Sequence, residues 1–468
     1  VKLVREVPEP SAEQLEQAIS NAHQRNFSWA NTPIETRAAC LERAADLFEQ
    51  RLSEFMALAI KEGGKTLNDA LAEVREAVDF CRYYAMRARL DLMPQLLPGP
   101  TGEENWLSFQ GRGVIACISP WNFPLAIFIG QVTAALVTGN TVIAKPASQT
   151  PLIATAAVQL LHEAGIPGDV LQLLPASGAV IGPKITFDPR IKGIVFTGST
   201  ETAREINQGL ANREGGILPF IAETGGQNAM IVDSSALKEQ VVVDVLNSAF
   251  GSAGQRCSAL RVLFVQEEMA DSLIEMLCGA MAELKLGDPS ELFTDVGPVI
   301  DSAAKQTLQE HFDRMSQEAK LLYQCKLPSG LDQTNFFAPS LFELSSLDLL
   351  KREVFGPILH VIRYAAKDRE RVIHAINHTG YGLTLGIQSR IQHTVDTISR
   401  QVHVGNQYVN RSMIGAVVGV QPFGGEGLSG TGPKAGGPHY LPRLCLERSL
   451  SINTTAAGGN ASLLCLEE

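Results

Sequence analysis

The sequence predicts an α/β protein that is built on two separate sheets. The chain has 468 residues, 45% of them hydrophobic, which is too long for one ordinary core, and we expect two or three domains. From residue 113 to residue 197 short β-rich runs alternate with helical patterns, and a second alternation starts near residue 228. Such alternation is typical of a parallel sheet that carries helices on both faces.

The first ninety residues are expected to be mostly helical. Residues 11–25 have an amphipathic helical pattern. The segment Thr32-Pro33-Ile34-Glu35 offers a capping hydroxyl, a first-turn proline and a glutamate, which predict a capping box at the start of a long helix. Residues 91–111 contain three prolines and are more typical of an extended arm than of a core.

The two alternating regions predict their elements in chain order. In the first we expect strands at 114–118, 141–145, 170–174 and 191–197 and helices at 123–137 and 151–164. In the second we expect strands at 229–232 and 260–265 and helices at 241–250 and 268–284. Residues 444–453 are strand-like, and a Gly/Ala-rich tail follows them.

Composition excludes several classes of protein. The net charge is −11 and no block of Lys or Arg stands out, so we expect neither nucleic acid nor an anionic membrane as a partner. The most apolar stretch, 123–137, is shorter than the roughly 20 residues that span a bilayer. The chain begins at Val1 without an initiator methionine, and we expect it to be part of a longer protein.

Neither a disulfide framework nor a metal site is expected. The eight cysteines include no Cys-x-x-Cys pair, which indicates a reducing compartment and a cytoplasmic location. His374 and His378 have the spacing of a helical metal pair but lack a third ligand, so an exposed helix face is the favoured interpretation.

One cysteine has the setting of a nucleophile. Cys257 lies in Phe-Gly-Ser-Ala-Gly-Gln-Arg-Cys-Ser, and Glu223, 34 residues earlier, begins Glu-Thr-Gly-Gly-Gln-Asn. A thiol among small residues and an upstream carboxylate on a glycine-rich turn can carry covalent catalysis followed by activation of water. Taken alone, a cysteine is usually a small buried hydrophobe and a glutamate a solvated charge. The sequence therefore indicates a thiol enzyme only when the two are read together.

Six motifs in order resemble the aldehyde dehydrogenases. They are Ile118-Ser-Pro-Trp-Asn-Phe-Pro, Lys145-Pro-Ala, Phe196-Thr-Gly-Ser-Thr, Glu223-Thr-Gly-Gly, Gly254-Gln-Arg-Cys and Glu353-Val-Phe-Gly-Pro. The resemblance covers nearly the whole chain. It implies the aldehyde dehydrogenase fold: a Rossmann-like dinucleotide-binding domain, an α/β catalytic domain and a small β oligomerisation arm.

The resemblance assigns three catalytic roles. Cys257 is the nucleophile that attacks an aldehyde carbon, the side-chain amide of Asn122 and the Cys257 N–H hold the oxyanion, and Glu223 activates water. A glutamate base argues for hydrolysis of the thioester rather than transfer to coenzyme A. The thiol would need activation by positive charge, amide donors or the cofactor's cationic ring, because its ordinary pKa is about 8.5.

The resemblance also implies NAD as cofactor. The residues that match the family's cofactor contacts are Ile118, Pro120, Trp121, Lys145, Gly198, Ser199, Glu353 and Phe355. Lys145 would hold the adenosine ribose, Gly198 and Ser199 the pyrophosphate at a helix start, and Glu353 the second ribose. Ser148 stands where many relatives have a glutamate, and Ala203 where they have a glycine, which weakens the choice between NAD and NADP.

The segment from Gly415 to His439 looks like that of glutamate-semialdehyde dehydrogenases, most of all the dehydrogenase module of bifunctional proline-utilisation proteins. In that subfamily an anchor loop offers backbone N–H groups to the substrate's α-carboxylate. The matching substrate-binding residues are Arg256, Ser258, Gly415, Ala416 and Phe423, and Glu76 is a weaker match for a group that meets the α-ammonium. The tract 424–437 also fits a flexible linker on composition alone.

The implied activity is oxidation of L-glutamate γ-semialdehyde to L-glutamate with NAD, the second step of proline catabolism. The alternatives are a dehydrogenase of another carboxylate-bearing semialdehyde, a thiol esterase or acyltransferase, and a scaffold without activity. The implied division is an NAD-binding domain at 1–92 and 112–222, a catalytic domain at 223–415, an oligomerisation arm at 93–111 and 441–468, and an anchor loop with its return segment at 416–440. A homodimer or larger homo-oligomer is expected, fused to or coupled with a proline dehydrogenase.

Overall fold

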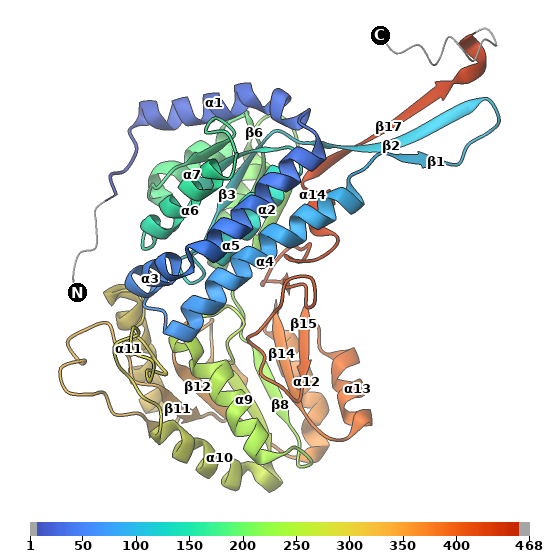
Figure 1. Cartoon of the computed structure of the whole chain (residues 1–468). Helices are drawn as coiled ribbons and strands as arrows, with labels where there is room; N and C mark the ends of the chain where they lie inside the picture. Colours follow the sequence, from blue (N-terminus) through green and yellow to red (C-terminus); the bar gives the residue numbers. More distant parts are fainter. Residues whose placement is uncertain (1–6, 458–468) are drawn as a thin grey trace.

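The computed structural model describes residues 7–457, which form two α/β lobes and a projecting β arm (Figure 1). The blue-to-green lobe contains the first alternating region and the green-to-orange lobe contains the second. The fold class predicted from the sequence is confirmed. Among the described residues, no helix is both long and apolar enough to cross a bilayer.

The first lobe is built on a five-stranded parallel sheet with the order β5-β4-β3-β6-β7. Its strands are β3 (Val114–Ile118), β4 (Thr141–Lys145), β5 (Leu171–Leu173), β6 (Ile191–Thr197) and β7 (Phe220–Glu223). Its helices are α1 (Ala12–Ala30), α2 (Ile34–Gln50), α3 (Leu52–Gly63), α4 (Leu67–Asp91), α5 (Ala126–Val137), α6 (Pro151–Glu163), α7 (Gly178–Phe187) and α8 (Thr200–Asn212). The chain runs outward from β3 to β5 and then returns to β6 on the other side of β3, so the strand order reverses beside β3.

Two details of this lobe differ from the expectation. The predicted capping box at Thr32 is wrong: α2 begins after Pro33 without a side-chain cap. The Thr32 hydroxyl instead donates to the Ser28 carbonyl at 3.1 Å, because the end of α1 lies directly before it. Helix α7 was not expected, since Gly178, Gly182 and an internal proline lower its intrinsic helix propensity.

The second lobe contains a seven-stranded sheet with the order β10-β11-β12-β9-β8-β14-β15, in which only the β10–β11 pair is antiparallel. Its strands are β8 (Ala229–Val232), β9 (Val262–Gln266), β10 (Lys320–Gln324), β11 (Ser340–Glu343), β12 (Ile358–Tyr364), β14 (Thr384–Gln388) and β15 (Asn406–Val409). Its helices are α9 (Lys238–Phe250), α10 (Glu267–Ala282), α11 (Ser302–Glu318), α12 (Arg369–His378) and α13 (Gln392–Gln401).

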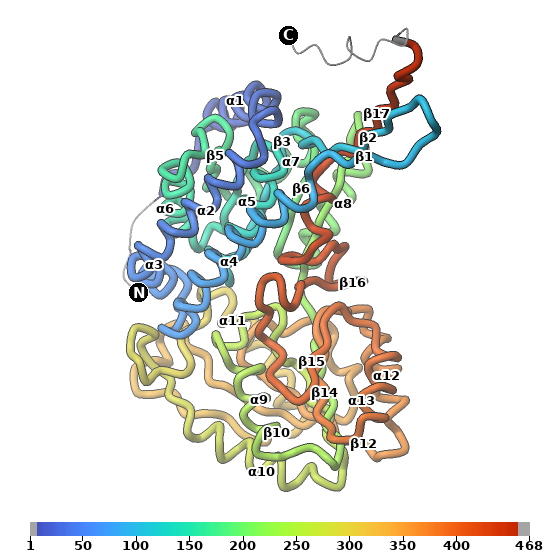
Figure 2. The backbone as a smooth tube through the Cα atoms, turned by 45° about the vertical axis from the view of Figure 1, so that its right-hand side comes forward, coloured from blue at the N-terminus to red at the C-terminus, as the bar shows by residue number. Residues whose placement is uncertain are grey.

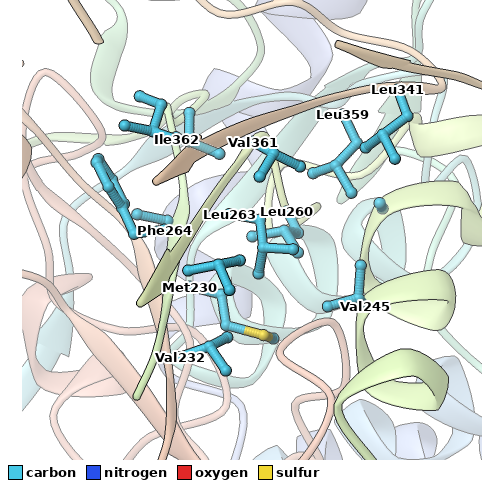
Figure 3. Packing of buried hydrophobic residues seen from close by; sticks show 14 of the residues in the cluster. Met230, Val232, Val245, Leu260, Leu263, Phe264, Leu341, Leu359, Val361 and Ile362 are labelled. Atoms are coloured by element: carbon cyan, nitrogen blue, oxygen red, sulfur yellow. The ribbon is translucent and has the colours of Figure 1, made fainter. Parts of the chain in front are cut away.

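The core of the second lobe lies between this sheet and its helices. Figure 3 shows aliphatic side chains of β8, β9 and β12 packed toward Val245 of α9. Met230, Leu263 and Val361 are fully buried there. His374 and His378 are exposed on α12, as the sequence interpretation expected.

The arm is a three-stranded antiparallel sheet, β1 (Gln95–Leu97), β2 (Glu103–Gly111) and β17 (Cys445–Asn453), in the order β1-β2-β17. It extends away from both lobes in Figures 1 and 2. Leu96 and Leu450 are 60% and 57% exposed on it. The expected arm reached residue 468, and its last part, 458–468, lies outside the described residues.

The two lobes are joined by short segments that bring distant residues together. Residues 224–228 lead from the end of β7 to the start of β8. The tract after residue 415 returns to the first lobe through β16 (Glu426–Gly427), which pairs with β13 (Tyr381–Gly382), and through α14 (Tyr440–Arg443). Thr224 N–H donates to the Ser429 carbonyl at 2.9 Å, so the tract lies against the crossing segment.

Candidate active site

The Cys257 loop is held in an unusual backbone conformation. It follows α9 and a single 3₁₀ turn, η1 (Gly251–Gly254), in which Ser252, Ala253 and Gly254 have φ of 56°, 53° and 67°. Left-handed backbone costs non-glycine residues roughly 1–2 kcal/mol each. A Cβ on Gly254 would lie 2.3 Å from the Gly356 carbonyl oxygen, so only glycine fits there. Strain of this kind concentrates at functional sites.

A buried arginine holds this loop from behind. Arg261 is 1% exposed and donates to the carbonyls of Gly254 at 2.6 Å and Arg256 at 3.0 Å. The same guanidinium pairs with Glu353 at 3.2 Å and lies 5.2 Å from the centre of the Phe355 ring. Arg261 therefore ties the Cys257 loop to the segment that carries Glu353. Sequence reasoning missed it, although a lone charge in the apolar run 260–265 was a signal for a buried pair.

Asn122 lies beside the cysteine loop. Its side-chain amide donates to the Gln255 carbonyl at 3.1 Å, two residues before Cys257. The structure thus brings together the predicted nucleophile and the predicted oxyanion donor, which are 135 residues apart in the sequence. An amide in this place has a second N–H that can serve a substrate oxygen.

The Cys257 thiol is protonated at neutral pH in this environment. Burial, followed by the nearby carboxylates of Glu353 and Glu223, raises the pKa of Cys257 to about 12. The Ser258 N–H and the Arg261 charge act in the opposite direction. The thiol therefore needs a further positive charge or donor before it can act as a nucleophile.

Glu223, the predicted base, is enclosed by the glycine-rich tract. The Gly425 N–H donates to Oε2 at 3.1 Å, and Cβ atoms on Gly424 and Gly430 would lie 2.7 and 3.1 Å from the carboxylate oxygens. Burial raises the pKa of Glu223 well above its usual range, and the Gly425 N–H and Lys434 lower it in part. The tract is therefore an ordered wall of the site and not a flexible linker. Sequence reasoning gave Lys434 no role.

Residues predicted to bind substrate lie on the α4 side of Cys257. Arg256 pairs with Asp69 at 2.5 Å and donates to the Ile414 carbonyl at 3.4 Å, directly before Gly415 and Ala416. Among the described residues, neither the Gly415 nor the Ala416 N–H has a hydrogen-bond acceptor. Both remain free to serve an anion.

The other three residues of this group are Ser258, Phe423 and Glu76. Ser258 is buried, and its carbonyl accepts a bond from the Thr384 hydroxyl at 3.2 Å. Phe423 pairs through its backbone with Ala435. Glu76 is half-buried on α4, and burial, followed by the charge of Glu73, raises its pKa to about 8, whereas Arg256 lowers it.

A cavity of about 750 Å³ opens at the carboxyl ends of β3, β4 and β6, where the strand order of the first sheet reverses. Open parallel sheets bind ligands at such a reversal. Six of the eight predicted cofactor-binding residues line the cavity: Ile118, Pro120, Trp121, Lys145, Gly198 and Ser199. Ser148 lines it too, as do parts of α7 and α8 that sequence reasoning did not include.

The remaining two predicted cofactor residues, Glu353 and Phe355, do not line the cavity. Phe355 meets Trp121 edge-on, with ring centres 5.6 Å apart. Glu353 is turned toward Arg261, and a Cβ on Gly225 would lie only 1.7 Å from its carboxylate. Burial lowers the pKa of Lys145, whose amine donates to the Pro146 carbonyl at 3.0 Å.

These features fit a dinucleotide. The cavity is lined by the buried cation of Lys145 at the end of β4 and by the N-terminus of α8, where Ser199 caps the Thr202 N–H at 3.2 Å. The volume lies within the usual range of roughly 300–1,000 Å³ for cofactor sites. Helix starts favour phosphate groups because their first N–H groups lack partners within the helix. Among the described residues, no group of three or more potential ligands gathers in a metal-binding arrangement.

Comparison with known proteins gives one family. The model of the "Aldehyde dehydrogenase family" matches residues 2–449. The chain is 51% identical to the bifunctional protein PutA of Klebsiella aerogenes over 454 residues, which are 95% of this chain and 34% of that protein. It is 38% identical to the 1-pyrroline-5-carboxylate dehydrogenase of Geobacillus thermodenitrificans over 449 residues, 94% of this chain and 86% of that protein.

A solved structure agrees with these matches. The 1-pyrroline-5-carboxylate dehydrogenase from Thermus with bound NAD superposes with a TM-score of 0.91 at 34% identity, covering 95% of this chain and 86% of that one. The chain spans only about a third of the PutA protein that it resembles.

Proposed function

Because the chain belongs to the aldehyde dehydrogenase family, we propose that it oxidises L-glutamate γ-semialdehyde, the open form of pyrroline-5-carboxylate, to L-glutamate with NAD. This reaction is the second step of proline catabolism. The observation that carries the proposal is the placement of Asn122 beside the Cys257 loop, with Arg256 reaching from that loop to the carbonyl before Gly415. Reaction and substrate recognition then share one short segment.

The chemistry starts at Cys257. Its sulfur attacks the aldehyde carbon, and the Asn122 amide and the Cys257 N–H stabilise the negative charge that develops on the carbonyl oxygen. Bound NAD supplies the hydride acceptor, which converts the adduct on Cys257 to a thioester. Loss of the thiol proton is favoured by the Ser258 N–H and the Arg261 charge, which lower the pKa of a thiol that burial raises.

Glu223 completes the cycle by taking a proton from the water that hydrolyses the thioester. Burial raises its pKa above the usual range of a carboxyl group, and a higher pKa makes the carboxylate a stronger base. The acid is released and Cys257 returns to its starting form. A glutamate in this place supports hydrolysis rather than transfer to coenzyme A.

Substrate recognition rests on groups near the anchor loop. The free N–H groups of Gly415 and Ala416 suit the α-carboxylate, because small residues allow the backbone to approach closely. Arg256 and Ser258 flank the nucleophile near the amino-acid head group, and Phe423 packs against the aliphatic part. Glu76, whose pKa is raised to about 8, would gain charge when an ammonium group approaches it.

The cofactor contacts follow the cavity. Lys145 would hold the adenosine ribose, Gly198 and Ser199 the pyrophosphate at the start of α8, and Glu353 the second ribose. Ile118, Pro120 and Trp121 form the wall on the β3 side, and Phe355 packs against Trp121.

The proposal extends to organisation. We propose the NAD-binding, catalytic, arm and anchor-loop segments given above as domains, and a homodimer or larger assembly formed through the arm with its exposed Leu96 and Leu450. The relatives named bifunctional proline utilization A support coupling to a second activity in proline utilisation, which we propose to be a proline dehydrogenase. A cytoplasmic location is proposed as well. Light scattering on the wild type and on Leu96→Asp/Leu450→Asp tests the assembly, which a monomeric wild type would refute.

The decisive experiment measures initial rates of NADH or NADPH formation with pyrroline-5-carboxylate and a panel of other semialdehydes. We expect the highest kcat/KM with pyrroline-5-carboxylate and NAD. Another preferred semialdehyde would identify the runner-up substrate. Ester hydrolysis without dinucleotide as the only activity would identify an esterase, and neither turnover nor cofactor binding would identify a scaffold.

A further inference from the structure

Helix α4 presents three acidic side chains toward the site. Asp69, Glu73 and Glu76 lie at positions i, i+4 and i+7 and therefore share one face of the helix. Asp69 pairs with Arg256, beside the nucleophile, and Glu76 is half-buried near Arg256. Glu73 is fully buried, and its contacts run to a different part of the site.

Glu73 caps the helix that follows Asn122. One of its carboxylate oxygens, Oε1, accepts the N–H groups of Leu125 and Ala126, each at 2.9 Å. These are the first donors of α5, and no side chain of α5's own N-terminal turn caps them. An anion at this end is also favoured by the helix dipole. The cap of α5 is thus supplied by a side chain of another helix of the same chain, α4.

Lys65 completes the arrangement. Its amine is 2.8 Å from Glu73 Oε2, and the two side chains are 3% and 0% exposed. The same amine lies 4.3 Å from the centre of the Phe123 ring. The Lys65–Glu73 pair therefore contacts residues 123, 125 and 126, which directly follow Asn122.

Stability alone is a poor reason for such a pair. A buried ion pair is usually no better for folding than apolar side chains of the same size. Within residues 7–457 the Asn122 amide, by contrast, makes one hydrogen bond, to Gln255, and so depends on its backbone for its position. An oxyanion donor is sensitive to such placement, because a 1 Å error costs about 100-fold in rate.

We propose that Glu73, neutralised by Lys65, is a positioning residue of the oxyanion site: by anchoring the start of α5 it fixes the side-chain amide of Asn122. The inference rests on the proposed function for the reaction that it serves. In this role Glu73 does not contact the substrate.

The test compares two double variants that differ only in whether residue 73 keeps an oxygen that can accept the Leu125 and Ala126 N–H groups. Lys65→Met/Glu73→Gln removes both charges but keeps an oxygen for the two N–H groups, whereas Lys65→Met/Glu73→Leu removes the acceptor as well. We expect the Leu variant to lose on the order of 100-fold in the single-turnover rate of NADH formation at saturating substrates, with nearly unchanged dinucleotide affinity by fluorescence titration. The Gln variant should retain most of the rate.

A matched control exists elsewhere in the lobe. Glu62 accepts the Leu152 and Ile153 N–H groups at 2.7 and 2.8 Å and so caps α6 in the same way, but α6 does not follow Asn122. Glu62→Leu should lower the unfolding midpoint without slowing the chemical step. An equal loss of rate in this control would overturn the inference, because it would attribute the effect to general destabilisation.

Asn122→Ala supplies the second arm of a double-mutant cycle. Alone it should cost about 100- to 1,000-fold, and in its background the Leu variant should cost no more than about 2-fold further. Equal losses in both backgrounds would refute positioning through Asn122, as would a Leu variant with the wild-type rate. If the Leu variant does not fold, Glu73→Asp replaces it in the cycle, since the shorter carboxylate stays opposite Lys65 but cannot reach both N–H groups.

Hydrolysis of p-nitrophenyl acetate at Cys257 tests the positioning role of Glu73 separately from the proposed function. It forms an oxyanion without dinucleotide or semialdehyde, so the cycle can be measured in it even if the wild type fails to oxidise pyrroline-5-carboxylate. Failure of that oxidation alone would refute the proposed function, and additive losses in ester hydrolysis would refute the positioning role.

Discussion

Replacing Arg261 by methionine should destabilise the protein severely, and mainly through one charge. In the wild type the guanidinium neutralises Glu353 at 3.2 Å and donates to two carbonyls of the Cys257 loop at 2.6 and 3.0 Å. Removing one member of a buried ion pair typically costs about 3–5 kcal/mol, because the other charge stays buried. We therefore expect Arg261→Met to lose about 4 kcal/mol at pH 7.5 and its urea midpoint to fall by about 1 M.

The loss should depend on pH in a defined direction. Burial already raises the pKa of Glu353, and removal of Arg261 raises it further above the unfolded value of about 4.3. A carboxyl whose folded pKa is raised binds more protons in the folded state, so stability falls as pH rises through that interval. The deficit of Arg261→Met relative to wild type should thus be smallest near pH 5 and largest near pH 8.

The control is Arg261→Met/Glu353→Gln, measured by urea unfolding followed with circular dichroism and without dinucleotide. Removal of both charges should recover most of the pH-dependent part of the loss and leave a smaller, pH-independent cost from the two carbonyls that lose their donor. A deficit that is constant from pH 5 to 8, or a double variant no more stable than the single one, would refute the charge argument.

Four further outcomes are expected. Cys257→Ala should abolish NADH formation while fluorescence titration gives an unchanged dinucleotide affinity; residual turnover would argue against its role. Glu223→Gln should give one rapid equivalent of NADH per site and then stop, because the thioester persists, and steady turnover would contradict this. Since Lys434 lowers the raised pKa of Glu223, the acid limb of the kcat profile should move to higher pH in Lys434→Met, and an unmoved limb would exclude this coupling. Ala416→Pro removes one free N–H and should raise the KM for pyrroline-5-carboxylate more than the KM for NAD; equal changes would indicate a general distortion.

Local sequence signals predicted much of the secondary structure. Strands β3, β4, β6 and β8 have the expected bounds. Each is a short β-branched run between helices, and such a run fits a strand better than a helix. Helix α7 was missed since its glycines and internal proline argue against a helix, and only its packing in the first lobe overrides that preference. The misplaced cap at Thr32 has a similar origin, because the end of α1 competes for its hydroxyl.

The individual catalytic residues of the site could be predicted from the sequence, but the ion pairs that hold them in place could not. Motif resemblance named Asn122, Glu223 and Cys257, and the fold places them near one another. The ion pairs that hold them, Arg261 with Glu353 and Arg256 with Asp69, join residues 92 and 187 positions apart. Hydrophobic periodicity is a local property and carries no information about such distant ion pairs. A charged residue within an apolar run, Arg261, was the only sequence signal of a buried pair.

The arm has a consequence for how the chain folds during synthesis. Strand β17 pairs with β2 along its whole length, and the Ser108 and Arg448 that face each other are 340 residues apart. While the ribosome is still producing the second lobe, β2 has only the three-residue β1 beside it and exposes an open edge. A pairing this distant forms late, because the entropy of closing so long a loop must be overcome first. This edge of the nascent first lobe therefore stays open until β17 has been synthesised.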